Sequence, residues 1–472
     1  MDHSLPLDGA SMAWPWALPF VGILLSIAVG PLLFPKVWHA HYGKIVLAWA
    51  ALTIAPLAIF QGGAVALATV LQVMLSDYVS FILLLFALYT VAGGILISGS
   101  IRTSPWTNVG IVALGTVMAS FVGTTGASLI LVRPLIRANE GRRHNVHVVI
   151  FFILLVGNIG GALTPLGDPP LFVGFLHGVD FLWPAQNLWL QTVIVSMLVL
   201  AIFVIVDLWL FRYETAQAQP LSEPLRLRGL INFVLFGAII AAILGSATWK
   251  PGIAFHVHTV NVELQNVLRD GALVLIAIMS LLLTRDEHRG ANGFTWEPIR
   301  EVAILFAGIF VAIAPVMAML QAGSAGAFAF LLRAVTAHDG TPHEAAYFWL
   351  TGLLSAFLDN TPTYVVFFEL AGGDPKALMG PLAGTLASIS MGAVYMGALT
   401  YIGNAPNLIV RSIAQERGIE MPNFFAYMLW AGLVLIPLFG IAHASADFTA
   451  VELAVMPVSV DQVHSHKSKF AR

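Results

Sequence analysis

Long runs of hydrophobic residues recur along the chain, and short polar segments separate them. A helix needs about 20 apolar residues to cross the hydrocarbon core of a bilayer. A shorter apolar run at residues 64–75 fits either a crossing or a helix at the membrane interface. The pattern predicts uninterrupted membrane-spanning helices at residues 16–34, 44–60, 79–99, 188–211, 229–248, 270–284, 300–320 and 424–443.

Four further apolar segments are interrupted by polar residues, glycine and proline. Residues 146–178 and 381–414 begin as apolar helices and break at TPLGDPP and TYIGNAP, because proline and glycine do not continue a helix. Residues 107–138 and 345–371 are split by FVGTTGA and FLDNTPT into halves too short to cross. Irregular backbone at membrane depth survives only where protein or a wet cavity satisfies its polar groups. We therefore expect an all-α polytopic membrane protein with about ten transmembrane helices, two of them broken, and two re-entrant hairpins.

The interrupted segments form an internal repeat. FVGTTGA at Phe121 recurs as FLDNTPT at Phe357, and GALTPLGDPP at Gly161 recurs as GALTYIGNAP at Gly397, so both motifs return after 236 residues. An odd number of predicted crossings separates the two hairpins, so they enter from opposite sides and the repeats are inverted. Matching interrupted segments in two halves of a chain point to a binding site at the bilayer midplane.

The repeat divides the chain into five predicted parts. They are N-terminal spans (1–75), repeat 1 (76–215), a linker (216–229), repeat 2 (230–443) and a C-terminal tail (444–472).

The distribution of Lys and Arg predicts the orientation in the membrane. More of them fall in the loops on one side of the predicted spans, which places both termini outside and is typical of a bacterial inner-membrane protein.

Composition narrows the class of protein. The chain of 472 residues is 58% hydrophobic and 10% charged, far from the roughly 25% charged residues of soluble domains. Lipid is therefore the expected partner, and a net charge of −3 gives no footprint for nucleic acid. The absence of cysteine excludes disulfides and thiolate metal sites, and no phosphate-binding Gly-Lys-Ser/Thr loop is present. A secondary transporter without cofactors, rather than an enzyme, is the expectation.

The tips and breaks carry the candidate chemistry. A broken helix leaves carbonyl groups unpaired on one stub and N–H groups unpaired on the next, and hard cations prefer oxygen ligands. Hydroxyl, amide and carboxylate oxygens cluster there, and the candidate ion- or substrate-binding residues are Gly123, Thr124, Thr125, Asn158, Thr164, Asp168, Asp359, Asn360, Thr361, Thr400 and Asn404.

Each half contributes one carboxylate, Asp168 or Asp359, although the two are not at equivalent positions. A charged Asp at the centre of a membrane helix costs at least about 2.5–3.5 kcal/mol, so both need a role. Lys and Arg are absent from the tips and breaks, which favours a cation over a multiply charged anion. We expect both aspartates to bind the transported cation, Na⁺, in exchange for H⁺. Asp207, Glu369, His144 and His147 are expected to be ordinary structural or interfacial residues, and Asn158 is equally consistent with a hydrogen bond between helices.

With these motifs in hand, the sequence resembles the ion transporter superfamily, most closely NhaD-type sodium/proton antiporters and their citrate-transporter-like relatives. LDNTPT and GNIGGALTPLGDPP look like the tip and break motifs of that group. The resemblance implies a homodimer with a scaffold and a mobile transport part, built from the hairpins and broken helices, and elevator-type alternating access. It assigns cation binding by position to Gly123, Thr124, Thr125, Asp168, Asp359, Asn360, Thr361 and Asn404.

Two other functions remain open. A cation-coupled citrate or dicarboxylate symporter fits the same scaffold, because helix N-termini and hydroxyl groups hold carboxylates. The carboxylate-carrying relatives have Ser-Asn-Thr at their tips, whereas Gly-Thr-Thr and Asp-Asn-Thr stand here. An intramembrane aspartyl protease is a remote alternative, since Gly167-Asp168 resembles part of a GxGD motif, but Pro165 occupies the first glycine position and a protease does not explain the repeat.

Overall fold

The computed structural model describes residues 7–99, 101, 104–214, 224–337 and 339–444. The predicted C-terminal tail beyond residue 444 and residues 216–223 of the predicted linker lie outside the described residues. The described part is predominantly helical, and eight of its helical segments are long and apolar enough to cross a membrane. The expectation of a polytopic helical membrane protein is therefore confirmed.

The N-terminal region forms α1 (Leu18–Leu33), α2 (Pro35–Phe60) and a continuous helical stretch over Gly63–Gly93. That stretch consists of α3 (Gly63–Val73), a π-helical turn η3 (Met74–Tyr78) and α4 (Val79–Gly93). The third span was predicted at residues 79–99, and it instead begins at Gly63 and ends at Gly93. The polar pair Ser76-Asp77 interrupts the apolar pattern without ending the helix, because both residues are buried against other helices.

The two segments predicted as hairpins are pairs of helices that turn on one residue each. The prediction that every half is too short to cross is wrong for the first helix, Pro105–Val122, which is long and apolar enough to span a membrane. The first pair is α5 (Pro105–Val122) and α6 (Thr124–Asn139), and the second is α15 (Glu344–Leu358) and α16 (Asn360–Leu370). Gly123 and Asp359 make the turns with φ of 82° and 75°. These two residues are equivalent in the repeat, and both halves therefore reverse direction with the same backbone conformation.

The helix breaks lie at the predicted motifs. The first separates α7 (Val146–Leu155) from α8 (Pro169–Leu176), and the second separates α18 (Ala383–Met396) from α19 (Ala405–Glu416). A short 3-10 turn follows α7 and another follows α18, at Ile159–Gly161 and Gly397–Leu399. The other α-helices are α9 (Trp183–Phe211), α10 (Ile231–Thr248), α11 (Leu264–Leu283), α12 (Asp286–Ala291), α13 (Glu297–Gln321), α14 (Ala329–Ala334), α17 (Pro375–Met379) and α20 (Phe424–Ala444).

Two short pairs of strands lie in the loops of this predominantly helical protein. β1 (Leu96–Ser98) pairs antiparallel with β2 (Arg226–Arg228), and β3 (Ala254–Val257) pairs antiparallel with β4 (Val260–Glu263). Backbone N–H and C=O groups between helices need partners, and pairing two loop segments supplies them. The pairing of β1 with β2 also gives structure to the end of the segment that was predicted to be a linker.

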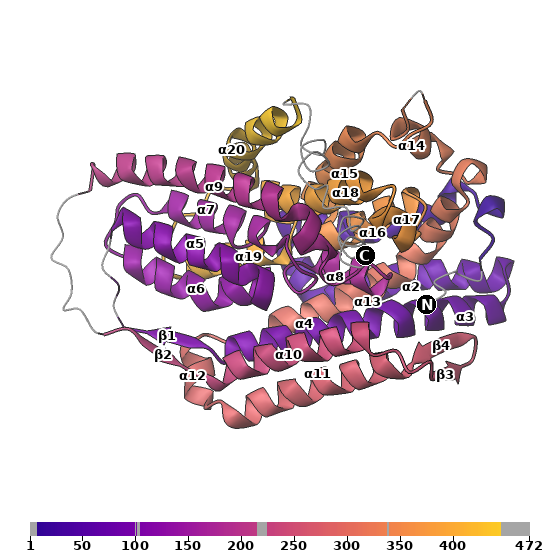
Figure 1. Ribbon diagram of the computed structural model, residues 1–472, viewed down its shortest axis with the longest axis horizontal. Helices are drawn as coiled ribbons and strands as arrows, with labels where there is room; N and C mark the ends of the chain where they lie inside the picture. Colours follow the sequence, from indigo (N-terminus) through magenta and orange to yellow (C-terminus); the bar gives the residue numbers. More distant parts are fainter. Residues whose placement is uncertain (1–6, 100, 102–103, 215–223, 338, 445–472) are drawn as a thin grey trace, which may run out of the picture.

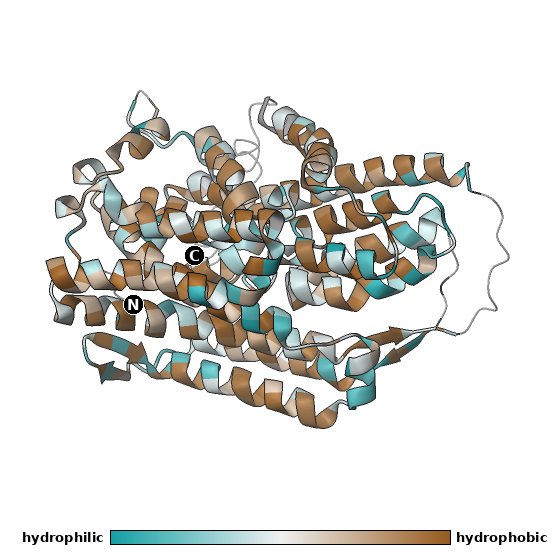
Figure 2. Ribbon diagram, turned by 180° about the vertical axis from the view of Figure 1, so that it is seen from behind, coloured by the Kyte–Doolittle hydropathy of each residue, from teal (hydrophilic) through white to brown (hydrophobic). Residues whose placement is uncertain are grey.

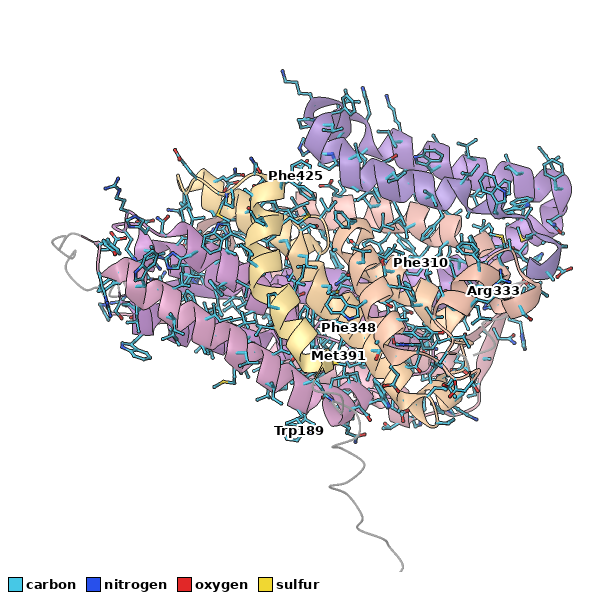
Figure 3. The ribbon with its side chains drawn as sticks, turned by 90° about the horizontal axis from the view of Figure 1, so that it is seen from above. Trp189, Phe310, Arg333, Phe348, Met391 and Phe425 are labelled. Atoms are coloured by element: carbon cyan, nitrogen blue, oxygen red, sulfur yellow. The ribbon has the colours of Figure 1, made fainter. Side chains whose placement is uncertain are left out.

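We distinguish two sets of helices (Figure 1), which also pack on each other through α4 with α6 and α13 with α16. We call α1–α4, α10, α11 and α13 the frame helices, because α13 packs on α1 to α4 and α4 packs on α10 and α11. We call α5–α9, α15, α16 and α18–α20 the site helices. Within this second group α8 packs on α16 and α19 packs on α6. Phe348 of α15, labelled in Figure 3, also meets Phe439 of α20 with ring centroids 5.6 Å apart.

Apolar side chains cover the outer faces as well as the core. Hydrophobic residues occupy most turns of the long helices (Figure 2), and Leu282, Ile59 and Phe425 are 79%, 75% and 73% exposed. Large contiguous apolar surface is rare on soluble monomers. It is the surface that a lipid environment requires.

Candidate functional site

The two tips and the two breaks meet at one buried carboxylate. Asp168 directly precedes α8, and its repeat equivalent Asn404 directly precedes α19. Both residues are extended, with φ of −139° and −155°, and a proline in the first turn of each helix fixes where the helix starts. The sequence thus places equivalent side chains at the N-termini of two half-helices.

Asp168 is only 1% exposed, and neutral donors from both halves hold its carboxylate. Oδ1 accepts hydrogen bonds from Thr124 Oγ1 at 3.0 Å and Asn404 Nδ2 at 2.9 Å. Oδ2 accepts from Asn360 Nδ2 at 2.5 Å. The structure therefore brings together one residue from each tip and one from each break, four of the predicted site residues.

A second pair of amides joins the breaks behind Asp168. Asn158 Nδ2 donates to Ile153 O and to Asn407 Oδ1, both at 2.8 Å. Asn407 Nδ2 donates to Gly397 O at 2.9 Å and Thr400 O at 2.8 Å. The hydrogen bond between helices that the sequence allowed for Asn158 is present, and these amides satisfy carbonyl groups that the breaks leave without helical partners.

Thr164 and Thr400 tie each break to its own tip. Thr164 Oγ1 donates to Ser120 O, and Thr400 Oγ1 donates to Ala356 O. Each hydroxyl also accepts from the backbone N–H two residues later, at 3.1 Å and 3.2 Å. The same contacts therefore occur twice, at positions 236 residues apart, and both hydroxyl groups bind backbone in this conformation.

Asp359 has a different environment from Asp168. Its carboxylate accepts from the N–H of Thr361 at 3.1 Å and caps α16, and its side chain is partly exposed. Its backbone φ of 75° with ψ of 143° lies in a region that is essentially restricted to glycine and costs other residues about 1–3 kcal/mol. Such strain at a non-glycine residue is common at functional sites.

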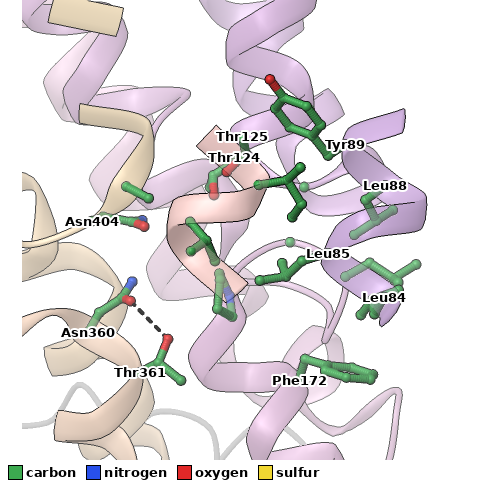
Figure 4. A pocket seen from close by; sticks show the side chains of 18 of the residues that line it. Leu84, Leu85, Leu88, Tyr89, Thr124, Thr125, Phe172, Asn360, Thr361 and Asn404 are labelled. Carbon is green, nitrogen blue, oxygen red and sulfur yellow. Dashed lines mark hydrogen bonds between the residues drawn. The ribbon is translucent and has the colours of Figure 1, made fainter. Parts of the chain in front are cut away.

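A pocket opens beside this network, between the site helices and the frame helices (Figure 4). Leu84, Leu85, Leu88 and Tyr89 of α4 form one wall, opposite Asn360 and Asn404. The site helices contribute the two tips and part of the breaks, among them Gly123, Thr124, Thr125, Asp359, Asn360, Thr361 and Asn404. Asp359 is the only charged residue that lines the pocket within the described part of the chain, and Asp168 lies directly behind Thr124, Asn360 and Asn404.

The helix N-termini add a positive electrostatic field. α6 and α16 begin at the two tips, and α8 and α19 begin at the two breaks. The unpaired N–H groups of a helix N-terminus carry about half a positive charge. This arrangement stabilises a negative charge next to the pocket, either that of Asp168 or that of a bound anion.

Sequence reasoning missed the apolar wall of the site and much of its polar surroundings. Tyr89 of α4 and Phe306 of α13 line the pocket, but aromatic residues within apolar spans carry no signal of their own. Asp207 of α9, expected only to be an ordinary structural residue, contacts Arg142 at 2.6 Å and His147 at 2.9 Å. Packing of α7 and of the α6–α7 loop against α9 brings these residues together.

Glu214, which follows the end of α9, binds the backbone of the α6–α7 loop. Burial alone would raise the pKa of this carboxyl, but hydrogen bonds from the backbone N–H groups of Arg143 and His144, at 2.9 Å and 2.8 Å, lower its pKa. His144 also pairs with Glu214 at 3.2 Å. His144 therefore helps to hold the loop that leads into α7, whereas His147, expected at the interface, is buried within α7 at 3% exposure.

Half-helices that meet around a buried carboxylate, in a chain with this many membrane-spanning helices, define a multi-pass membrane protein of the transporter class. The chain belongs to the family described as putative citrate transport, whose model matches residues 9–444. Two curated relatives are similar to it over 334 residues with 27% identity, covering 67% of this chain and 71% of the relative. They are Uncharacterized transporter Mb2703 of Mycobacterium bovis (strain ATCC BAA-935 / AF2122/97) and Uncharacterized transporter Rv2684 of Mycobacterium tuberculosis (strain ATCC 25618 / H37Rv).

The geometry gives no support to the protease alternative. An aspartyl protease needs two carboxyl groups close enough to share one proton. Both oxygens of Asp168 accept from Thr124, Asn360 and Asn404, and the carboxylate of Asp359 accepts from Thr361. The family and the relatives are transporters, in agreement with the expectation that the chain is not an enzyme.

Proposed function

We propose that this protein is a secondary transporter that exchanges a cation, Na⁺ in the first instance, for H⁺, with Asp168 as the group that binds both in turn. The observation that carries this proposal is a carboxylate enclosed entirely by neutral hydrogen-bond donors from both halves of the chain. A buried carboxylate without a basic partner favours binding either a proton or a cation, because both neutralise its charge.

The surrounding side chains suit both states of this exchange. Asn360 and Asn404 direct their amide nitrogens to Asp168, and these hydrogen bonds stabilise the carboxylate when neither a proton nor a cation is bound. An amide carries an acceptor oxygen opposite its nitrogen, so rotation of either side chain presents an oxygen ligand instead. Na⁺ bound at Asp168 would then have the carboxylate, one or two amide oxygens and the Thr124 hydroxyl as ligands, the oxygen-rich set that hard cations prefer.

Asp359 would act as the second cation ligand, from the wall of the pocket. It is the only carboxylate there within the described residues, and its strained backbone presents it beside Asn360 and Thr361. Gly123, Thr125 and Thr361 line the same pocket from the first turns of α6 and α16. Thr164, Thr400 and Asn158 would support the site by holding the breaks.

We further propose inverted repeats with re-entrant hairpins and elevator-type movement of the site helices against the frame helices. The equivalent turns at Gly123 and Asp359 and the equivalent bonds of Thr164 and Thr400 support the repeat. The position of the pocket between the two groups of helices supports the movement. In this proposal the protein resembles NhaD-type antiporters and acts as a homodimer in a bacterial inner membrane.

Citrate or dicarboxylate symport is the second candidate. Two observations favour it, the description of the family as putative citrate transport and the helix N-termini around the pocket. Against it stands the charge of the site, because Asp168 and Asp359 are both acidic and no Lys or Arg lines the pocket within the described residues. A bound tricarboxylate would need cations to offset this repulsion.

One assay separates the two candidates. Purified protein in proteoliposomes with an imposed pH gradient should show Na⁺-dependent dissipation of that gradient, and Asp168→Asn should abolish it. Asp359→Asn should raise the Na⁺ concentration needed for half-maximal exchange by at least tenfold. Asp339→Asn, in an exposed loop, is the matched control and should behave as wild type.

Labelled citrate and succinate are offered to the same vesicles. Uptake of either compound, together with no response of the pH gradient to Na⁺, Li⁺ or K⁺ between about pH 6 and pH 9, would show that the protein is a symporter and not an antiporter. Asp168→Asn with unchanged Na⁺/H⁺ exchange would refute the role of Asp168.

A further inference from the structure

A second cluster of buried ionisable side chains lies at the far end of α8. His177 directly follows the last residue of this helix. Its Nε2 lies 3.5 Å from Asp77 Oδ1, and its Nδ1 lies 3.6 Å from Glu369 Oε1. The side chains of His177, Asp77 and Glu369 are 4%, 8% and 2% exposed. The proposed exchange at Asp168 makes no use of these groups.

The cluster joins the site helices to the frame helices. His177 caps the C-terminus of α8 and Glu369 belongs to α16, whereas Asp77 lies in the π-helical turn η3 between α3 and α4. Gln321, the last residue of α13, donates its amide Nε2 to Glu369 Oε2 at 3.0 Å. Two site helices therefore meet two frame elements through four polar side chains.

Packing fixes the two groups that face His177. The ring of Phe368 stands edge-on to the imidazole with centroids 5.6 Å apart. A Cβ at Gly373 would lie 2.6 Å from Glu369 Oε2, so any larger residue there would require this carboxylate to shift. The charged groups that face His177 are Asp77 from η3 and Glu369 from α16, α13 supplies the neutral Gln321, and the Tyr364 hydroxyl lies against Gly174 one turn earlier on α8.

The arrangement of atoms selects the protonated imidazole. A neutral imidazole has one N–H and one lone pair, whereas the imidazolium has two N–H groups. Because each ring nitrogen faces a carboxylate oxygen, the neutral form would direct a lone pair at one of the two acids. A buried charge left without its partner is strongly destabilising, so gain or loss of one proton changes the strength of this contact.

We propose that Asp77, His177 and Glu369 form a second proton-binding site, separate from Asp168, which fastens α8 and α16 to η3 and α13 while His177 is protonated. Two parallel connections link it to the first site. α8 runs from Asp168 to His177, and α16 runs from Asn360, which binds Asp168, to Glu369. At 1.5 Å per residue each connection is roughly 12–14 Å long.

The consequence for transport rests on the proposed function. Movement of the site helices against the frame helices would have to break the contacts of His177 and Glu369 with Asp77 and Gln321. Release of the proton from His177 removes one of these attractions. Protonation at the cluster would therefore hold one conformation, and deprotonation would free α8 and α16 to move together with Asp168.

Thermal unfolding of the purified full-length protein tests the proton site without any transport assay. The imidazolium pairs with both acids only in the folded protein, so its stabilisation is present at low pH and is lost as the pH rises enough to remove the proton. We expect the wild-type Tm to fall by several degrees between about pH 6 and pH 9, and His177→Gln to remove most of this fall. His39→Gln, an exposed histidine of α2, is the matched control and should keep the wild-type slope.

Conservative variants keep the test decisive if His177→Gln does not fold. Asp77→Asn and Glu369→Gln each leave His177 with one acid and should each reduce the pH slope. Wild-type slopes in all three variants would overturn the proposal. A reduced slope together with absence of any Asp168-dependent exchange would keep the proton site and refute the proposed function instead.

Discussion

At the scale of single residues, the site is distinguished by its small number of charged side chains. Three neutral side chains, Thr124, Asn360 and Asn404, donate hydrogen bonds to the carboxylate oxygens of Asp168. Asp359 adopts the same backbone conformation as Gly123. This conformation strains every residue except glycine, yet an aspartate stands at this position. The strain is tolerated although it lowers stability, which is consistent with a functional demand for a carboxylate at that place.

This strain predicts an unusual order of stability. Asp359→Ala and Asp359→Gly both remove the carboxylate that caps α16, but only glycine adopts φ of 75° at no steric cost. We expect Asp359→Gly to be more stable than Asp359→Ala by about 1–3 kcal/mol, measured as the difference in denaturation midpoint. Gly123→Ala is the mirror control and should lose stability. Equal stability of the two Asp359 variants would show that the tip is not strained.

At the scale of elements, the breaks are built from close backbone contacts that need glycine. A Cβ added at Gly167 would overlap Gly161 O, and a Cβ added at the equivalent Gly403 would lie 2.5 Å from Gly397 O. The chain therefore folds back on itself between the half-helices with no space for a side chain. This approach places Asp168 and Asn404 directly after the turn, in contact with each other.

We expect alanine at either glycine to displace the break. Gly167→Ala should lower both thermal stability and transport, because Thr124 N–H donates to Gly167 O at 2.8 Å and ties the tip to the break. Gly403→Ala should act in the same direction. Gly237→Ala in α10 has nothing within 4 Å of the new Cβ and should be neutral or stabilising by up to about 1 kcal/mol. Full transport by Gly167→Ala would contradict the importance of the close approach.

At the scale of the whole molecule, the pocket and the His177 cluster both lie on the contact between frame helices and site helices. α4 and α13 provide the frame side of the pocket, and η3 and α13 provide that of the cluster. Relative movement of the two groups would change both places at once. The absence of cysteine makes this movement testable by cross-linking without background.

A disulfide between the two groups should block transport. A Cβ at Gly126 of α6 would lie 3.4 Å from Ala92 Cβ of α4, close to the 3.5–4.5 Å that a disulfide requires. We expect the Gly126→Cys/Ala92→Cys pair to lose transport on oxidation and to recover it on reduction. The matched pair within the frame is Gly308→Cys/Val46→Cys, with Cβ atoms 3.6 Å apart, and its oxidation should leave transport unchanged. Transport by the oxidised first pair would exclude relative movement of α4 and α6.

The sequence by itself determined the features that depend on neighbours along the chain. Proline and glycine end helices wherever they stand, so TPLGDPP, TYIGNAP and the two tips were located to within a few residues, and the repeat made their correspondence visible. Apolar runs gave the spans for the same local reason. The starts of the spans were predicted less well. α2 begins at Pro35 and α11 at Leu264, ahead of the predicted residues 44 and 270, and burial of Ser76 and Asp77 keeps the third span helical from Gly63.

Only the tertiary structure decided which polar groups meet. The contact between Asp168 and Asn404 joins residues 236 positions apart, and His177 lies between Asp77 and Glu369, which come from segments that showed no motif for this contact. Such pairs form because a bilayer or a packed core offers no water, so every buried polar atom must find a partner wherever the packing brings one. The local sequence pattern does not indicate which partners meet, because the packing of the whole chain determines them.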